Sequence, residues 1–261
     1  MRKVFASVLI ASVLFSCTRY SQIYQVAPTS PIGIENDLYT FENDTVKIVY
    51  SFWNEYGTLS YSFYNKLDVP IYIDWKKCSF IRNGEKIDYW VEEVNTKIVS
   101  KTRGYGISNY NWLYPGTIGN WNLNNSITLT NSNAIKPTRV IFIAPRSAVT
   151  NIKFKLQLMP IASLTGKKIS VKLPGANNST QVRFIDYTIN NSPLFFRNFI
   201  SISLSEDFLR EKYIDNGFYV EKVIQLPTKK FKIPNPNYQT GQMRYKYPLA
   251  NSKWFYINLP E

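Results

Sequence analysis

Apolar side chains recur at every second position through much of this chain, and no other feature restricts the possible folds as strongly. Residues 46–52 (VKIVYSF) place four apolar side chains on one face of an extended segment, with Lys47 and Ser51 on the other. Successive side chains of a strand point to opposite faces, so this pattern predicts a strand with one buried face. The same alternation recurs in residues 59–64, 71–75, 152–158 and 168–173.

A hairpin and several further strands extend this pattern. Asn83-Gly84 separates two short strand-like segments, and this dipeptide tolerates the two positive-φ positions of a type I′ turn. We also interpret Asp215-Asn216-Gly217 as a hairpin turn, and Ser205–Tyr213 as the one helical segment, with Ser205 as its N-cap. Further strands are expected near residues 138–144, 181–189, 198–205, 218–226 and 253–259.

Strands with one polar face suit antiparallel sheets that pack on one side only. About a dozen short strands separated by Pro, Gly and Asn indicate a sandwich or barrel rather than a parallel sheet with crossover helices. We therefore predict an all-β fold: an antiparallel β-sandwich, immunoglobulin-like, with additional C-terminal strands. Residues 45–261 are expected to form this body, either as one unit or as two, 45–158 and 160–261. Residues 17–44 are expected to be a tether, of which 32–41 can add an edge strand.

The first seventeen residues have the layout of an export signal. Met1-Arg2-Lys3 is positively charged, and the apolar run of residues 4–15 makes a helix of about 18 Å, too short for a bilayer core of about 30 Å. Such a segment is typical of a cleaved signal peptide, here residues 1–16. The alternatives are a plain signal peptide in which Cys17 has no role, and an uncleaved anchor.

Leu14-Phe15-Ser16-Cys17 resembles the lipobox of bacterial lipoproteins, in which a small residue precedes the cysteine that is acylated. Phe15 departs from the small or aliphatic residue usual at its position. Residues 61–75, two apolar strands around a turn with Asn65, resemble the opening of immunoglobulin-like domains in uncharacterised Gram-negative envelope lipoproteins. The resemblance implies a lipid anchor at Cys17, and stable anchoring takes more than one acyl chain.

The residues after Cys17 bear on the location that this resemblance implies. Thr18 stands where inner-membrane retention is associated with Asp, and residues 18–22 lack the acidic cluster of some surface-export signals. By resemblance, we expect an outer-membrane lipoprotein on the periplasmic face, with surface exposure as the alternative.

Composition removes most catalytic chemistries. The chain has no His, which excludes Ser-His-Asp and Cys-His nucleophile systems as well as His-ligated zinc and haem. Its 2 Cys cannot build a metal site made of four cysteines or an iron–sulfur centre. We therefore expect no metal, no cofactor and no enzymatic activity. Cys78 is expected to be a small buried hydrophobe.

Paired carboxylates are the catalytic arrangement that composition leaves open, because glycoside hydrolysis needs only two Asp or Glu residues. The candidates are Asp74, Asp88, Glu92-Glu93 and Glu206-Asp207. Neighbouring side chains of a strand point to opposite faces, so Glu92 and Glu93 would not act together on one bond. A carboxylate-dependent glycoside hydrolase is the weakest of our alternatives.

Residues 104–125 form a long segment rich in Gly, Asn, Tyr and Trp. Long loops often carry binding sites, and aromatic faces can stack on sugars or on partner side chains. The candidate ligand-binding residues are Tyr105, Tyr110, Trp112, Tyr114 and Trp121. The alternative is that Trp112 and Trp121 fold back as a lid over the end of the sandwich.

The chain is basic, with 31 Lys and Arg against 18 Asp and Glu and a formal charge of +13. Short clusters lie at Lys76-Lys77, Lys167-Lys168 and residues 229–232. For an exported, anchored protein, the accessible partners are anionic headgroups or acidic glycans rather than nucleic acid. Lysines that keep edge strands from pairing are the alternative. We predict a non-catalytic lipoprotein that binds an envelope protein or a glycan, with carbohydrate binding through residues 104–125 as the second hypothesis.

Overall fold

Strands make up nearly all of the regular structure. The structure is a computed structural model, and it describes residues 18–29, 31–90, 138–162, 164–172, 178–234, 243–245 and 251–260. The elements in chain order are β1 (Tyr20–Pro28), β2 (Gly33–Glu35), β3 (Leu38–Glu42), β4 (Val46–Ser51), β5 (Thr58–Asn65), β6 (Ile71–Asp74), the 3-10 helix η1 (Trp75–Lys77), β7 (Ser79–Arg82), β8 (Glu85–Asp88), β9 (Val140–Ile143), β10 (Ala148–Lys155), β11 (Lys167–Val171), β12 (Thr180–Asp186), β13 (Phe195–Ser203), β14 (Glu211–Pro227), α1 (Thr228–Phe231), β15 (Lys232–Pro234), β16 (Met243–Tyr245) and β17 (Trp254–Asn258). Among these described elements, no helix is long and apolar enough to cross a bilayer.

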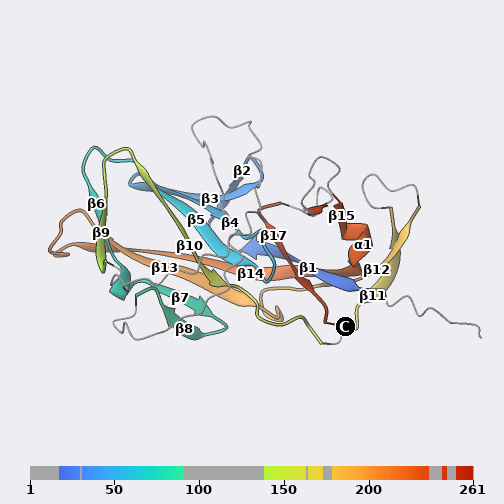
Figure 1. Ribbon diagram of the computed structural model, residues 1–261. Helices are drawn as coiled ribbons and strands as arrows, with labels where there is room; N and C mark the ends of the chain where they lie inside the picture. The colour runs from blue at the N-terminus through green and yellow to red at the C-terminus, as the bar shows by residue number, and fades with distance from the viewer. Residues whose placement is uncertain are drawn as a thin grey trace, which may run out of the picture.

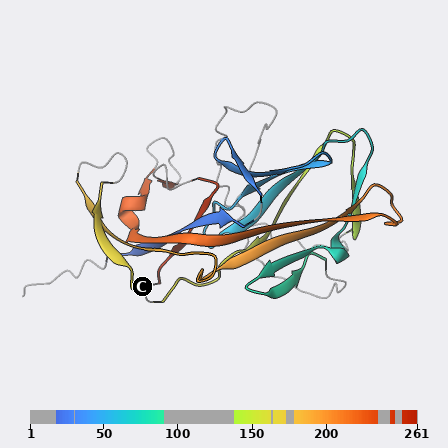
Figure 2. The same ribbon diagram turned by 180° about the vertical axis from the view of Figure 1, so that it is seen from behind.

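Two antiparallel sheets pack against each other, which confirms the predicted all-β sandwich (Figures 1 and 2). The larger sheet has the order β11-β12-β14-β13-β6-β9, with β1 paired to β14 and to β17, and with β7 paired to β13 and to β8. The smaller sheet has the order β10-β5-β4-β3-β2, and β15 and β16 form a separate ribbon. Strands from residues 45–158 and from residues 160–261 therefore share the larger sheet.

Strand β14 runs the length of the molecule. Its 17 residues would span about 50 Å if fully extended. Its first half pairs with β13, and its second half pairs with β1 and β12 on opposite sides. Figure 1 shows the β13–β14 hairpin, β6 and β9 at one end, which we call the distal end. The start of β1, α1 and the β11–β12 hairpin lie at the other end, the proximal end.

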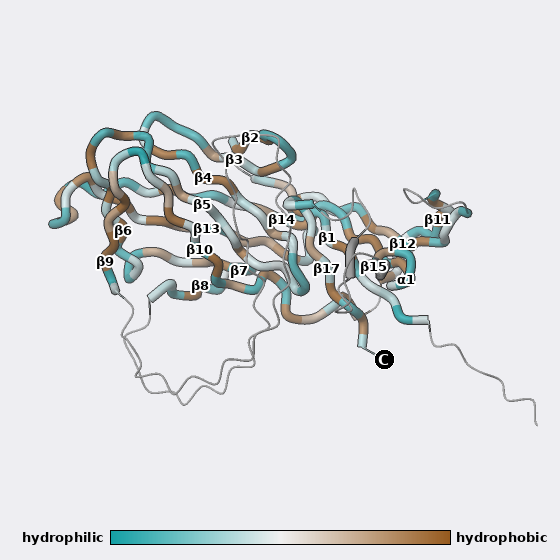
Figure 3. The backbone as a smooth tube through the Cα atoms, turned by 45° about the horizontal axis from the view of Figure 1, so that its top comes forward, coloured by the Kyte–Doolittle hydropathy of each residue, from teal (hydrophilic) through white to brown (hydrophobic). Residues whose placement is uncertain are grey.

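Aromatic side chains from both sheets form the centre of the core. The ring of Phe52, which follows β4, lies 5.0 Å from Phe218 and 5.4 Å from Phe196 of the larger sheet, measured between centroids. All three side chains are fully buried. Figure 3 shows apolar segments recurring along the strands of both sheets. Burial of each such side chain contributes about 1.5–3 kcal/mol, so this cluster helps to hold the two sheets together.

A small polar group sits inside this aromatic core. Asn198 of β13 and Asn216 of β14 lie directly opposite each other, and both donate to the hydroxyl of Tyr50, at 3.2 and 2.8 Å. The hydroxyl of Tyr89 donates to Asn198 Oδ1 at 2.7 Å. Because buried polar groups are costly when unpaired, these bonds favour one placement of the smaller sheet on the larger one.

The N-terminal segment differs from the expected tether over residues 17–44. Strand β1 lies between β14 and β17 inside the larger sheet, and Ile23 is fully buried there. The sequence of β1 does not alternate between apolar and polar residues, because the polar residue Gln22 is buried as well. Its side-chain amide donates to the carbonyl of Ile161 and accepts from the N–H of Ile161, both at 2.9 Å. The expected edge strand within residues 32–41 is present as β2 and β3 of the smaller sheet.

The prediction of a turn at Asp215-Asn216-Gly217 is wrong, because β14 passes straight through these residues. Asn216 points into the core, where it donates to Tyr50. Gly217 makes room for a neighbouring segment: a Cβ there would lie 2.2 Å from Thr29 Oγ1. Asn216 and Gly217 are residue types common in turns, but in this strand they allow close packing in the core. The turn at Asn83-Gly84 is confirmed, with φ of 49° and 85° between β7 and β8.

The prediction of a helix over Ser205–Tyr213 is also wrong. Residues 204–210 form the loop of the β13–β14 hairpin, and β14 begins at Glu211. Asp207 Oδ1 accepts from the hydroxyl of Ser205 at 2.6 Å and from the N–H of Leu209 at 3.1 Å. Side-chain acceptors of this kind offer the backbone an alternative to helical bonds. The residues that follow this loop, from Glu211 onward, form β14 and pair with β13.

Candidate interaction surface

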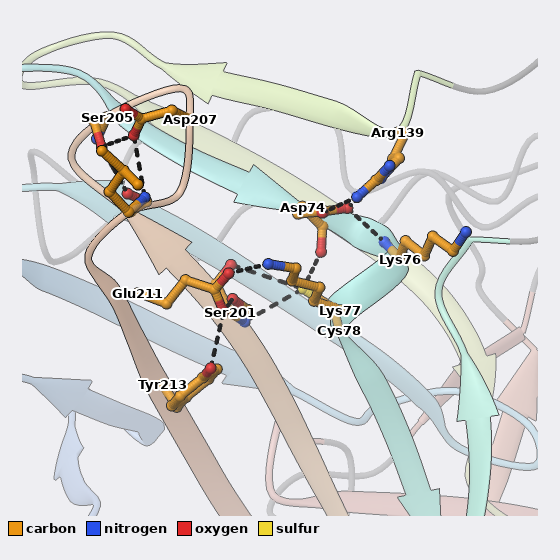
Figure 4. A network of polar contacts seen from close by, with 12 residues as sticks. Asp74, Lys76, Lys77, Cys78, Arg139, Ser201, Ser205, Asp207, Glu211 and Tyr213 are labelled. Atoms are coloured by element: carbon orange, nitrogen blue, oxygen red, sulfur yellow. Dashed lines mark hydrogen bonds and ion pairs between the residues drawn. The ribbon is translucent and has the colours of Figure 1, made fainter.

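The distal end is held by an ion pair between the buried Asp74, at the end of β6, and the partly exposed Arg139. Arg139 Nε donates to Asp74 Oδ1 at 3.0 Å, and Arg139 Nη2 donates to Asp74 Oδ2 at 2.7 Å (Figure 4). The same Asp74 Oδ1 accepts from the N–H of Lys76 at 3.0 Å and so caps η1. The Asp74 side chain is only 2% exposed, whereas that of Arg139 is 48% exposed. The pair therefore joins β6, η1 and the residue that precedes β9.

The electrostatics of Asp74 do not suit acid–base catalysis. Burial alone would raise the pKa of this carboxyl, but the Arg139 guanidinium and the Lys76 N–H outweigh burial and lower it. The group is thus ionised near neutral pH, and both of its oxygens have partners. Asp74 is one of the candidates for a carboxylate-dependent hydrolase, but its described contacts give it a structural role.

A second group of polar contacts ties η1 to the β13–β14 hairpin. Lys77 forms an ion pair with Glu211 at the start of β14, and the hydroxyl of Tyr213 donates to Glu211 Oε2 at 2.8 Å (Figure 4). The Lys77 ammonium lowers the pKa of Glu211. Lys77 Nζ also lies 5.4 Å from the ring centroid of Phe208, within range of a cation–π contact. The loop of the hairpin is thereby held beside η1.

Cys78 lies beneath these contacts. It is fully buried, its thiol donates to the Asp74 carbonyl at 3.2 Å, and its sulfur accepts from the N–H of Ser201 at 3.4 Å. Burial raises the pKa of the thiol to about 12. Because the thiolate is the reactive form, Cys78 does not fit a nucleophile. The expectation of a small buried hydrophobe is confirmed.

Two of the other described carboxylate candidates, Asp88 and Asp207, also have polar partners. Asp88 pairs with Lys86 at 2.6 Å on β8, and Asp207 caps the hairpin loop. Within the described ranges, no group of three or more His, Cys, Asp or Glu residues is arranged to hold a metal ion. Glu92 and Glu93 lie outside the described residues.

Large apolar side chains are exposed beside this scaffold. Leu209 is 81% exposed and Phe142 is 67% exposed, and Leu204 and Tyr213 are exposed nearby on the β13–β14 hairpin. We call these four residues the distal surface. Exposed apolar side chains at one end of a molecule are candidates for an interaction site. The hairpin loop and β9 present these side chains, and the ion pairs of Asp74 and Glu211 hold both elements against η1.

The backbone of β9 adds to the distal surface a sheet edge that has no partner among the described strands. The N–H of Trp75 donates to the carbonyl of Arg139 at 2.9 Å, so residues alternating from Arg139 bond to β6. The N–H and C=O groups of Val140 and Phe142 consequently point outward. Among the described strands, none pairs with this outer edge.

The edges at β11 and β10 are protected by charge or irregularity. Strand β11 carries Lys167 and Lys168, and β10 carries Lys153 with a bulge between residues 152 and 155. Such features block edge-to-edge pairing, and the sequence of β9, VIFI, contains none of them. Its edge therefore fits the addition of a partner strand.

The residues predicted to form the ligand site and the anchor fall outside the described ranges. This holds for Cys17 and for the aromatic candidates Tyr105, Tyr110, Trp112, Tyr114 and Trp121. Sequence reasoning expected a strand near residues 138–144 but missed its exposed edge. The sequence does contain an indication of this edge: residues 140–145, between Arg139 and Arg146, are uncharged and do not alternate between apolar and polar residues as residues 46–52 do.

Comparison with known protein families, with curated proteins and with solved structures finds no match to this chain.

Proposed function

We propose that this chain is a non-catalytic lipoprotein of the bacterial envelope, anchored at Cys17 and binding a partner protein through the distal surface. The two ends support different halves of this proposal. All described strands begin at or after Tyr20, so cleavage before Cys17 leaves each of them complete. The partner surface lies at the far end of β14.

The open edge of β9 carries the binding half of the proposal. This four-residue strand has no charge and exposes the side chain of Phe142, and it lacks the lysines that protect β10 and β11. A partner strand would gain main-chain hydrogen bonds from Val140 and Phe142, while apolar side chains of the distal surface add contact area. The described carboxylates and thiol give no competing catalytic arrangement.

The anchor is tested by mass spectrometry of the N-terminal peptide from the native protein. The proposal predicts a chain that starts at Cys17 and carries acyl groups. Cys17→Ser should remove the acyl groups and release the protein from membranes. A wild-type peptide that starts elsewhere, or an unmodified Cys17 in membrane-bound protein, would contradict the anchor.

The partner surface is tested by a photo-crosslinking amino acid at Phe142, with Ile34 as the matched control. Ile34 is 61% exposed and lies on β2, at the edge of the smaller sheet. We expect a discrete protein adduct in living cells from position 142 and none from position 34. Equal adducts from both positions would contradict a specific surface. Bound glycan without any protein adduct would instead favour the carbohydrate-binding alternative and residues 104–125.

A further inference from the structure

The fold begins almost immediately after Cys17. Thr18 and Arg19 are the only residues between Cys17 and β1. The carbonyl of Arg19 already accepts from the N–H of Thr228 at 2.8 Å, and Ser21 Oγ lies 2.9 Å from Thr228 Oγ1. Two residues span at most about 7 Å. A lipid on Cys17 would therefore hold the proximal end against the membrane, instead of letting the body move on a long tether.

Exposed lysines surround this point of attachment. Lys229 and Lys230 are the next residues after Thr228, in α1, and both are exposed. Lys167, Lys168 and Lys172 are exposed on and just after β11. Figures 1 and 3 place α1 and β11 at the same end of the molecule as the start of β1.

These lysines have no carboxylate partners within the described part of the chain. Some basic residues at the distal end are matched, as in the pairs of Lys77 with Glu211 and Arg139 with Asp74. Edge protection accounts for lysines on β11 but not for Lys229 and Lys230, because α1 is a helical turn rather than an edge strand. The unmatched charge of α1 thus needs another explanation.

We propose that the proximal end is a docking surface for the anionic headgroups of a lipid bilayer, with Lys229 and Lys230 at its centre. The inference deepens the proposed function, since the acyl chains on Cys17 would bring this surface to the membrane. Electrostatic attraction falls off over about 8 Å at physiological ionic strength, and the two-residue spacer keeps the lysines near that range. Each lysine held near an anionic surface strengthens binding about 5-fold.

Tyr20 fits the same surface. It lies at the start of β1, three residues after Cys17, and is 39% exposed. Tyrosine is enriched at membrane–water interfaces because one end of its side chain is apolar and the other polar. The docked surface would therefore combine a lipid anchor, an interfacial aromatic residue and lysines.

The test uses the chain from residue 17 onward with Cys17→Ser, which keeps every described strand and removes the contribution of the acyl chains. Its partitioning onto vesicles of phosphatidylcholine alone is compared with vesicles that also contain phosphatidylglycerol. Lys229→Gln/Lys230→Gln is compared with the control Arg210→Gln/Lys212→Gln, which removes the same charge from exposed distal residues without a described ion pair. Circular dichroism checks that each variant is folded.

We expect salt-sensitive binding to the anionic vesicles only, weakened about 30-fold by the α1 variant and by less than about 2-fold by the control. Equal losses in both variants would show attraction by net charge and would overturn the inference. Displacement by soluble glycerophosphate would indicate a phosphate site instead of a membrane surface and would also overturn it. Because this chain carries no lipid, failure here is distinguishable from failure of Cys17 acylation, which the N-terminal peptide reports.

Discussion

At the distal end, Lys77 and Arg139 lie against carboxylates, whereas at the proximal end Lys229 and Lys230 are exposed without a described carboxylate partner. Arg139 holds Asp74, and Lys77 holds Glu211. Both ends belong to one sheet and are joined by β14. The same residue type therefore has two uses here. Where cations are paired, they order the backbone around a partner surface, and where they are unpaired, their charge remains available to an anionic surface.

Strand β1, which follows the predicted anchor, is part of the folded sandwich. It contributes Ile23 to a small cluster at the proximal end that includes Val182, Leu226, Phe231 and Tyr256. An anchor attached to a buried strand fixes the orientation of the whole body, whereas an anchor on a flexible tether does not. The two-ended account therefore depends on β1 being structural.

The largest decrease in the free energy of unfolding is expected from Ile23→Asp, which disrupts the core at the proximal end. Ile23 is fully buried, and an unpaired carboxylate at that position costs about 4 kcal/mol or more. We predict loss of the folded state, measured by urea unfolding. Tyr20→Asp, at the partly exposed start of the same strand, serves as the control and should stay folded. If Ile23→Asp unfolds at the same urea concentration as the wild type, β1 is a tether after all.

A smaller loss is expected from Asp74→Asn at the distal end. The substitution removes the charge from a buried pair and weakens two hydrogen bonds from Arg139, which should cost about 2 kcal/mol. Asp68→Asn is the matched control, because Arg146 also donates two bonds to Asp68 but the Asp68 side chain is 81% exposed. We expect no measurable change in the free energy of unfolding for Asp68→Asn. Equal losses from both variants would contradict the role of burial.

The pH dependence of stability should follow the same pair. The pKa of Asp74 is lowered in the folded protein, so its contribution is complete above the unfolded value near pH 4 and is lost as pH falls further. Wild-type unfolding free energy should therefore fall from about pH 5 downward, more steeply than that of Asp74→Asn. Parallel pH profiles for the two proteins would show that another group dominates.

The smallest expected effect is a change in the labelling rate of Cys78, whose buried thiol reports opening of the distal end. Its thiol is buried and its pKa is raised to about 12, so thiol reagents should react only after the distal end opens. With Cys17→Ser as background, we expect slow labelling of the native protein and rapid labelling in urea. Asp74→Asn should accelerate native labelling, and Lys229→Gln/Lys230→Gln should not. Rapid labelling of the unmodified background would show that the distal end is open.

Much of the fold was predictable from residue patterns because most strands bury one face only. Residues 46–51 alternate strictly in burial, as β4 shows, and the Asn83-Gly84 turn follows from its dipeptide. The pattern failed where polar residues are buried. The buried Gln22 interrupts the alternation that would have indicated β1. Asn216 and Gly217 are common turn residues, but here Asn216 donates to Tyr50 in the core and Gly217 leaves room for Thr29.

The candidate surface was less predictable than the fold. Phe142 lies in an expected strand, but the sequence pattern does not show that β9 is the last of the described strands in its sheet, because the pairing of distant segments decides this. The Asp74–Arg139 pair likewise joins residues far apart in the chain. Lys229 and Lys230 were visible as a basic cluster, but their position beside β1 depends on the bond between Arg19 and Thr228.

The most direct test of the two-ended account is the distance of each end from the membrane in the native lipidated protein. A donor fluorophore would be attached at Pro260→Cys, exposed beside Tyr20, or at Leu209→Cys, with acceptors in the bilayer. The account predicts strong energy transfer from position 260 and little from position 209, which β14 can hold as far as about 50 Å away. Equal transfer from both positions, or stronger transfer from position 209, would contradict it.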